Sequence, residues 1–306
     1  MSHLTYTEAI VVGLFQGVAE LFPVSSLGHS VLIPALVGGR WARDLNVSTP
    51  ESPYLAFIVG LHVATAIALL AFFWRDWLRI ITGLLTSVRD RRIQTPDQRL
   101  AWLIILATIP VGITGLLIEH TFRTVLGKPV PAAIFLALNG AVLYAGERLR
   151  RRDSVAADRA VAASVGQTHS SLALASDQRL ARLGFGRGTV IGAAQILALL
   201  PGISRSGVTM VAGLLRGLSH EDAARFSFLL ATPVILAAGV LKIPDLTGPL
   251  GDGIHGQVLA GSVLSGVGAY VSVRFLTRYF ETRTLTPFAV YCVLAGLGSL
   301  IWLGIR

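Results

Sequence analysis

Two short segments of this 306-residue chain carry side chains capable of acid–base and phosphate chemistry. The first contains Gln16, Glu20, Ser25, Ser26 and His29. Residues four apart share one face of a helix, so Gln16 and Glu20 should lie together. A carboxylate, a hydroxyl and an imidazole in one short segment can supply a nucleophile with a base or an acid. We therefore predict Glu20, Ser26 and His29 as catalytic residues.

The second segment is centred on Arg205, which lies in an otherwise uncharged apolar stretch from Gly188 to Leu215. A guanidinium at membrane depth is costly, so it should face a polar cavity or an anion rather than lipid. Arginine binds phosphate in a bidentate manner, and small neighbours let backbone N–H groups approach a bound anion. The predicted phosphate-binding residues are Ser25, Ser204, Arg205, Ser206 and Thr209, and Arg205 is also predicted as catalytic because it can offset charge in the transition state.

Each of these residues also has a structural interpretation when it is considered alone. Glu20 could form a hydrogen bond between helices, His29 could be a buried interhelical histidine, and the serines could cap a hairpin. Their combination with Arg205 favours catalysis. His62, in the following apolar segment, could line the same cavity, although an interhelical hydrogen bond is the preferred interpretation.

Composition indicates a membrane protein with several spans. The chain is 53% hydrophobic and 14% charged, whereas soluble domains contain about 25% charged residues. A very large soluble core is the disfavoured alternative. The net charge of +9 would suggest nucleic-acid binding in a soluble protein. Here the basic residues cluster between apolar segments, which is typical of cytoplasmic loops and predicts no nucleic-acid partner.

Cysteine content and the N-terminus exclude two further classes. The single Cys292 allows neither a disulfide framework nor a cysteine-based metal site. Residues 1–9 lack a basic region and a small-residue cleavage site, so we expect no removable signal peptide.

Six segments are apolar over the roughly 20 residues that a membrane span needs. They are residues 54–74, 100–120, 130–149, 222–242, 257–277 and 286–304. Two further apolar regions, 7–37 and 186–217, are interrupted by proline-containing turns, so each half is too short to span. We predict an all-α polytopic membrane protein with six full transmembrane helices and two re-entrant helical hairpins. Kinked full spans are the alternative for the hairpins.

The order of hairpin and three spans occurs twice, which predicts a repeat. The first repeat covers 1–149, the second covers 186–306, and residues 150–185 form a solvated cytoplasmic linker with a short surface helix at 172–183. Three spans per half force the second half to be inverted, which brings the two hairpin tips together near the midplane. Segments 75–99 and 148–187 are then basic cytoplasmic loops, and both termini lie outside.

The two segments resemble motifs of the BacA/UppP family of undecaprenyl-diphosphate phosphatases. Residues 16–29 are similar to its pattern (Glu/Gln)-x-x-x-Glu-x-x-Pro-x-Ser-Ser-x-Gly-His, and residues 201–209 to Pro-Gly-x-Ser-Arg-Ser-x-x-Thr. The resemblance continues into residues 226–233. It implies an enzyme of the bacterial inner membrane that opens outward and converts a polyprenyl pyrophosphate lipid, undecaprenyl pyrophosphate, into the monophosphate carrier of peptidoglycan synthesis. It also implies an association with bacitracin resistance.

The resemblance further implies roles for individual residues and a divalent cation, Mg²⁺ or Ca²⁺. Gln16 and Glu20 match the acidic pair and become candidate metal ligands, Ser26 matches the nucleophile, and His29 matches the motif histidine. The phosphate-binding residues of the motif correspond to Ser204, Arg205 and Thr209. Gln16 stands where many members have glutamate, and a neutral amide weakens a metal site that needs two carboxylates.

Several alternatives stay open from the sequence. A transporter or flippase of a polyprenyl phosphate would need the same arginine and hydroxyls, but not an aligned nucleophile and proton donor. A structural scaffold leaves Arg205 unexplained. Either Ser26 or a water molecule can be the nucleophile, and either Glu20 or His29 can be the base. Besides its lipid substrate and the surrounding membrane lipids, a second copy of the chain in a homodimer is a candidate partner.

Overall fold

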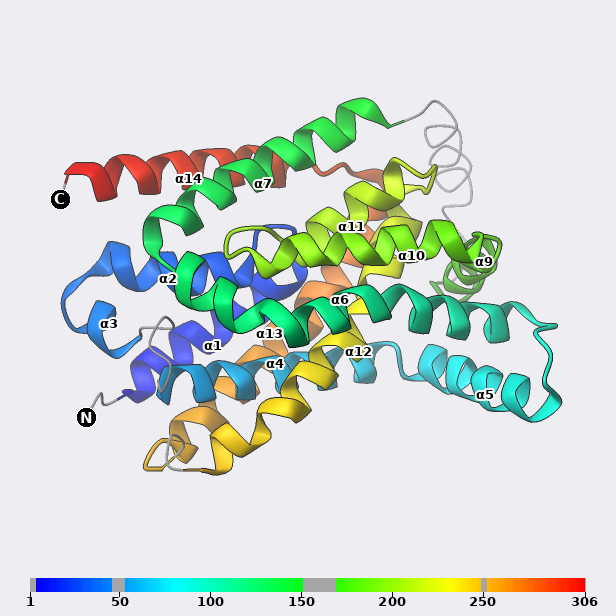
Figure 1. Cartoon of the computed structure of the whole chain (residues 1–306), viewed down its shortest axis with the longest axis horizontal. Helices are drawn as coiled ribbons and strands as arrows, with labels where there is room; N and C mark the ends of the chain where they lie inside the picture. Colours follow the sequence, from blue (N-terminus) through cyan, green and yellow to red (C-terminus); the bar gives the residue numbers. More distant parts are fainter. Residues whose placement is uncertain (1–3, 46–52, 151–168, 249–251, 306) are drawn as a thin grey trace.

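The computed structural model describes residues 4–45, 53–150, 169–248 and 252–305, and all regular structure in these ranges is helical (Figure 1). The long helices are α4 (Pro53–Phe72), α6 (Pro96–Leu126), α7 (Pro129–Leu149), α12 (His220–Thr247), α13 (His255–Thr282) and α14 (Thr286–Ile305). Within the described ranges, five helices are long and apolar enough to cross a membrane, and a sixth span results if α4 is counted with the helix after it. The predicted all-α polytopic membrane protein is confirmed.

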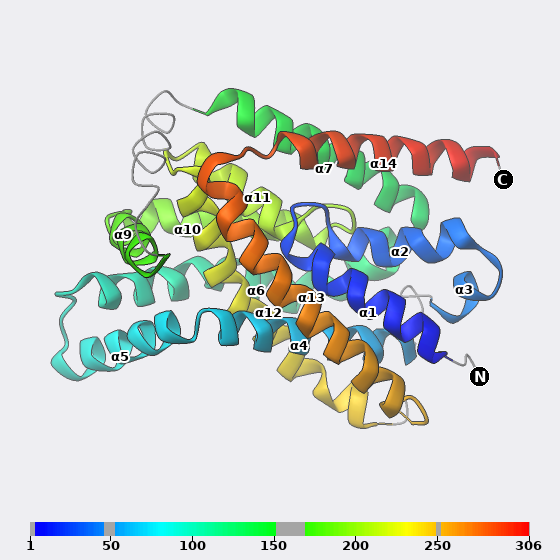
Figure 2. The ribbon, with the colours of Figure 1, turned by 180° about the vertical axis from the view of Figure 1, so that it is seen from behind.

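Both interrupted regions are pairs of short helices. The first consists of α1 (Tyr6–Leu21) and α2 (Ser26–Val37), followed by α3 (Gly39–Asp44). The second consists of α10 (Phe185–Ala193), the 3₁₀ helix η1 (Ala194–Leu199) and α11 (Arg205–Leu214). In both ribbon views the chain enters and leaves each pair at the same end of the molecule (Figures 1 and 2). The pairs are therefore hairpins rather than kinked spans.

The segment 75–99, predicted as a basic loop, is mostly helical. Helix α5 (Trp74–Asp90) follows α4 after one residue and at an angle of 85°. Large apolar side chains recur at helical spacing along one exposed face, namely Trp74, Leu78, Ile81, Leu85 and Val88. The prediction of a loop was wrong because the arginines between these positions obscured an amphipathic pattern. Helices with this pattern lie in the membrane interface rather than across the bilayer.

A short helix, α9 (His169–Ala181), lies in the predicted linker and close to the surface helix expected at 172–183. The rest of that expectation, residues 151–168, falls outside the described ranges. Asp177 of α9 is buried and accepts hydrogen bonds from Arg79 of α5 at 2.7 Å and from Arg225 of α12 at 2.7 Å. These ion pairs fasten α9 to the two neighbouring helices.

The hairpins pack against long helices through close backbone contacts. Helix α1 lies along α13, where Gly13 faces Gly261, and α10 lies along α6, where Gly192 faces Ala107. Small residues at such contacts let helix backbones approach inside a membrane. Helix α4 also packs on α12, and α7 on α14. If the two halves are related by symmetry, the contact of α1 with α13 is equivalent to that of α10 with α6, and α4 corresponds to α12 and α7 to α14. The division into repeats at 1–149 and 186–306 stays a prediction.

The two ends of the molecule differ in character. The N- and C-termini lie at one end, whereas α5 and α9 lie at the other (Figures 1 and 2). We call the latter the basic end, because Arg75, Arg79, Arg89 and Arg179 belong to these two helices. Between the ends, apolar side chains such as Leu116 and Leu117 are 73% and 75% exposed, which suits a lipid-facing surface.

Candidate active site

Gln16 and Glu20 lie one turn apart near the end of α1, and both are buried. The amide Nε2 of Gln16 donates a hydrogen bond to Oε2 of Glu20 at 2.9 Å. The sequence spacing predicted this shared helix face, and the structure confirms it. Glu20 is thus an oriented carboxylate inside the bundle.

The tip of the first hairpin holds a strained residue, Ser25. Its φ of 66° and ψ of 96° place a non-glycine residue at positive φ, which costs about 1–3 kcal/mol and is typical of functional turns. Ser25 caps α2 by accepting a hydrogen bond from the N–H of Gly28 at 3.2 Å. The turn directs the next residue, Ser26, toward α1, where its Oγ donates to Oε2 of Glu20 at 2.5 Å.

Arg205 begins α11 at the tip of the second hairpin, after the capping residue Ser204. Its Nη2 lies 3.1 Å from Oε1 of Glu20, so the two carboxylate oxygens face different hairpins. Its Nη1 is buried and has no hydrogen-bond partner among the described residues. A buried donor without a partner is costly, and a bound anion would supply the missing acceptor.

The two hairpin tips touch through glycine. A Cβ atom on Gly28 would lie 2.7 Å from the Cα of Gly202, which is too close for a real contact. Gly202 itself has a φ of 113°, a conformation that favours glycine. These two positions therefore allow the approach that brings Arg205 to Glu20.

Asn139 of α7 joins both tips, and sequence reasoning missed it. Its Nδ2 donates to the carbonyl of Pro23 at 3.1 Å, and its Oδ1 accepts from the N–H of Ser204 at 3.0 Å. The side chain is fully buried. A lone asparagine in an otherwise apolar span was the signal that could have identified it, because buried polar groups in membranes need partners.

His62 of α4 also belongs to this cluster. Its Nε2 lies 3.4 Å from Oε2 of Glu20 and 3.3 Å from Nε2 of Gln16, while its Nδ1 donates to the carbonyl of Ile58 at 2.9 Å. The expected interhelical contact is present, and it is made to the central carboxylate itself. His62, rather than His29, is therefore the histidine that contacts the central carboxylate.

His29 lies away from the carboxylate. Its Nδ1 donates to the carbonyl of Ser25 at 2.7 Å, and its Nε2 is 2.8 Å from the hydroxyl of Tyr291 on α14. The two rings are also stacked, with centroids 5.7 Å apart. The structure thus does not bring His29 to Glu20 or Ser26, and its catalytic role stays a prediction.

The remaining predicted hydroxyls form internal hydrogen bonds. Ser206 donates to the carbonyl of Phe22 at 3.1 Å, and Ser204 contacts the same carbonyl at 3.4 Å. Thr209 donates to the carbonyl of Arg205 at 2.7 Å within α11. These bonds fix the second tip against the first. Direct binding of phosphate by Ser25, Ser204, Ser206 and Thr209 stays a prediction.

The donor set does not form a divalent-cation cage by itself. In the described ranges no group of three or more His, Cys, Asp or Glu side chains is placed to hold a metal ion. Both oxygens of Glu20 already accept hydrogen bonds, and Arg205 places a positive charge beside them. Mg²⁺ is usually held by one or two carboxylates together with substrate phosphates and water molecules. A cation bound at Glu20 and Gln16 therefore stays a prediction.

The cluster is suited to transfer of a phosphoryl group. A hydroxyl that donates to a carboxylate can be deprotonated as it attacks. A guanidinium with one free edge can hold the phosphate and stabilise charge in the transition state. Ser26 with Glu20 provides the first function and Arg205 the second, and both Ser26 and Arg205 lie within hydrogen-bond distance of Glu20.

Several known proteins are similar in sequence to this chain along nearly its whole length. Residues 9–298 match the family described as bacitracin resistance protein BacA. The undecaprenyl-diphosphatase of Mycolicibacterium paratuberculosis is 70% identical over 305 residues, covering 100% of this chain and 99% of that protein. Undecaprenyl-diphosphatase 1 of Frankia casuarinae is 54% identical over 370 residues and 100% of both chains. Undecaprenyl-diphosphatase 2 of Chromobacterium violaceum is 43% identical over 299 residues, covering 96% and 98%. The two matching motifs meet in one buried cluster. By this similarity over nearly its whole length, the chain belongs to the BacA family.

Proposed function

We propose that this chain hydrolyses undecaprenyl diphosphate to undecaprenyl phosphate and inorganic phosphate. The observation that carries the proposal is the contact of Glu20 with Ser26 through one oxygen and with Arg205 through the other. This geometry supports phosphoryl transfer, and the names of the relatives at 70% and 54% identity specify the lipid. No observation favours the alternative of a polyprenyl-phosphate flippase.

The reaction proceeds in two steps. Oγ of Ser26 attacks the terminal phosphorus while Glu20 takes the hydroxyl proton, and the bond from that phosphorus to the bridging oxygen breaks. Undecaprenyl phosphate leaves with the bridging oxygen. Water then attacks the phosphoserine, its hydroxyl joins phosphorus, and its other proton passes to solvent. The Ser26–phosphate bond breaks as Glu20 returns its proton to Oγ.

Arg205 binds the terminal phosphate during both steps. Its Nη1 is a buried donor that has no partner in the described part of the chain, and its Nη2 is held by Glu20 at 3.1 Å. The fork is therefore oriented before substrate binds, so little reorganisation is needed as charge develops. His62 contacts the same carboxylate and keeps it oriented between the two hairpins.

His29, Ser204 and Ser206 position the tips in this proposal. His29 holds the carbonyl of the strained Ser25, and the two serines hold the carbonyl of Phe22. These contacts maintain the backbone that places Ser26 next to Glu20. The proposed steps need no proton transfer or phosphate contact from His29, Ser204 or Ser206.

The enzyme is a multi-pass membrane protein, and we place it in the bacterial inner membrane. The concentration of arginine on α5 and α9, opposite to both termini, supports a cytoplasmic basic end and an active site that opens to the other side (Figure 1). In this orientation the enzyme regenerates the lipid carrier of peptidoglycan synthesis. Removing the free diphosphate lipid would also account for bacitracin resistance.

Phosphate release from undecaprenyl diphosphate by the purified full-length protein tests the assignment. We expect Ser26→Ala and Glu20→Gln to lower kcat by at least about 100-fold. Ser299→Ala is the matched control, because in the described ranges this serine donates to the carbonyl of Ala295 within α14, away from both hairpin tips. Phosphoserine at position 26, trapped by acid quenching, would identify the nucleophile. Normal release by both site variants would overturn the proposed function.

A further inference from the structure

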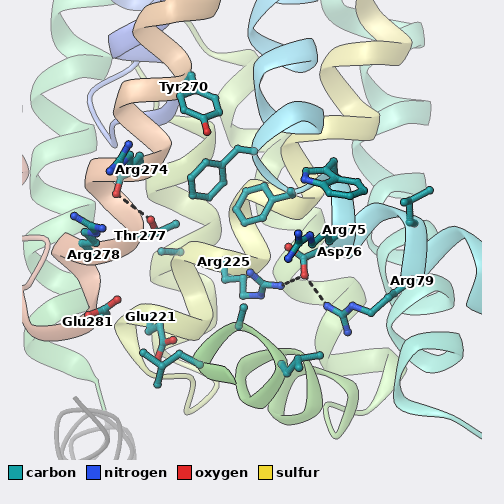
Figure 3. A pocket seen from close by; sticks show the side chains of 18 residues that line it. Arg75, Asp76, Arg79, Glu221, Arg225, Tyr270, Arg274, Thr277, Arg278 and Glu281 are labelled. Carbon is teal, nitrogen blue, oxygen red and sulfur yellow. Dashed lines mark hydrogen bonds and ion pairs between the residues drawn. The ribbon is translucent and has the colours of Figure 1, made fainter. Parts of the chain in front are cut away.

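A pocket lined by several charged residues lies at the basic end, separate from the hairpin tips. It has a volume of about 710 Å³ and is enclosed by the bend between α4 and α5, by α9, by the start of α12 and by the end of α13 (Figure 3). None of its lining residues belongs to the cluster around Glu20. The proposed hydrolysis does not use this pocket.

Cationic side chains line both walls of the pocket. They are Arg75, Arg79, Arg225, Arg274 and Arg278. Arg79 and Arg225 are structural, because both contact Asp76, at 2.6 and 3.1 Å (Figure 3). Arg75 and Arg274 differ, since both are exposed and neither forms an ion pair within the described part of the chain. The guanidinium of Arg75 lies 5.2 Å from the centre of the Trp74 ring.

An apolar groove lies next to the pocket. The groove has a volume of about 450 Å³, runs between α4 and α13, and shares Tyr270 with the pocket. Gly266 forms part of its lining, and the nearest atom to an added Cβ there is the carbonyl oxygen of Ala64 at 3.6 Å. A pocket lined by charged side chains next to an apolar groove matches the headgroup and the acyl chains of a lipid molecule.

We propose that this site binds a glycerophospholipid with an anionic, hydroxylated headgroup, of the phosphatidylglycerol class. Its phosphodiester lies between Arg75 and Arg274, and its acyl chains occupy the groove between α4 and α13. Basic pockets between transmembrane helices commonly bind anionic lipid headgroups on the cytoplasmic side. The inference goes beyond the proposed function and does not depend on it.

The carboxylates of the pocket select this headgroup class. Glu221, Glu281 and Asp76 also line the walls. A phosphate monoester carries nearly two negative charges at neutral pH, so these carboxylates would repel it more than a phosphodiester with one. They also offer acceptors to the hydroxyl groups of a glycerol headgroup.

Native mass spectrometry of the full-length protein in detergent, titrated with phosphatidylglycerol, tests the site. We expect the double variant R75Q/R274Q to bind this lipid about 30-fold more weakly, since each of the two arginines near the headgroup contributes about 1 kcal/mol. The matched control is R89Q/R92Q, which removes the same charge from outside the pocket at the other end of α5. Its affinity should equal that of the wild type.

A second variant tests the groove. Gly266→Leu should fill the groove and weaken binding of the long-chain lipid severalfold, while phosphate release from undecaprenyl diphosphate persists in both this variant and R75Q/R274Q. Retained release shows that the protein is folded and separates this site from the hairpin tips.

Three results would overturn the proposal. One is equal binding of phosphatidylcholine and phosphatidylglycerol. Another is an equal loss of affinity in the R89Q/R92Q control. The third is displacement of phosphatidylglycerol by equimolar polyprenyl monophosphate, which would assign the pocket to a monoester instead.

Discussion

Arg205 of the second hairpin contacts Glu20 of the first at 3.1 Å, although 185 positions separate them in the sequence. Both side chains are largely buried, so each neutralises a charge that would otherwise be unstable inside the bundle. Only one edge of the guanidinium is used in this pair, and the other has no partner among the described residues. The ion pair therefore orients Arg205 and leaves it able to bind an anion.

Substitution of Arg205 by lysine should separate charge from geometry. We expect kcat to fall by about 100-fold or more, because an ammonium group cannot contact Glu20 and a phosphate with a planar fork. Phosphate release and thermal unfolding should be measured on the same preparation, with the fold retained. Near-normal turnover in Arg205→Lys would show that the arginine is only structural.

Separating the two tips should impair activity without removing any polar group. In Gly28→Ala the new methyl group would lie 2.7 Å from the backbone of Gly202. We expect kcat to fall at least about tenfold, since displacements of about 1 Å strongly affect catalysis. Gly112→Ala is the control, because no atom of the described residues lies within 4 Å of an added Cβ there. Equal activity of the two variants would contradict the role of the tip contact.

Asn139 should contribute to both stability and activity. Asn139→Leu leaves the N–H of Ser204 and the carbonyl of Pro23 without this partner. Each unsatisfied group costs about 1–3 kcal/mol, so the free energy of unfolding should fall by at least that amount. Thermal unfolding and phosphate release should decline together, whereas Ser299→Ala should change neither. A stable variant with reduced kcat would instead indicate direct contact with substrate.

The two histidines should behave differently. We expect His62→Ala to lower kcat about tenfold, because it removes a partner of the carboxylate that takes the proton. His29→Ala should mainly lower the melting temperature, because the ring supports the turn at Ser25. Steady-state kinetics and thermal unfolding of both variants distinguish these effects. The reverse pattern would restore His29 as the acid or base.

Metal binding should be weak without substrate. The cluster has one carboxylate beside an arginine, so titration of the wild type with Mn²⁺ followed by paramagnetic resonance should show little binding. Gln16→Glu adds a second carboxylate one turn from Glu20 and should raise Mn²⁺ affinity about tenfold. Tight binding by the wild type would reveal ligands that Glu20 and Gln16 do not account for.

Much of the fold could be predicted from the sequence, because long apolar segments and their interruptions are local features. In the described ranges, five of the six predicted spans coincide with helices long and apolar enough to cross a membrane, and the segment 54–74 coincides with α4. The two hairpins lie where the proline-containing turns placed them. Helix α5 was missed because its apolar stripe alternates with arginines and does not reach the hydropathy of a span. An interfacial helix needs only one apolar face, so average hydropathy does not detect it.

The sequence by itself determined the types of residue in the site: a carboxylate with a glutamine on one helix face, a serine pair at a turn, and a lone arginine in an apolar segment. Only the tertiary structure decided which of them meet. It brought Arg205 and His62 to Glu20, turned His29 toward Tyr291, and added Asn139. Spacing along one helix fixes local neighbours, but contacts between hairpins depend on close backbone approach at Gly28 and Gly202 and on pairing of buried polar groups across helices.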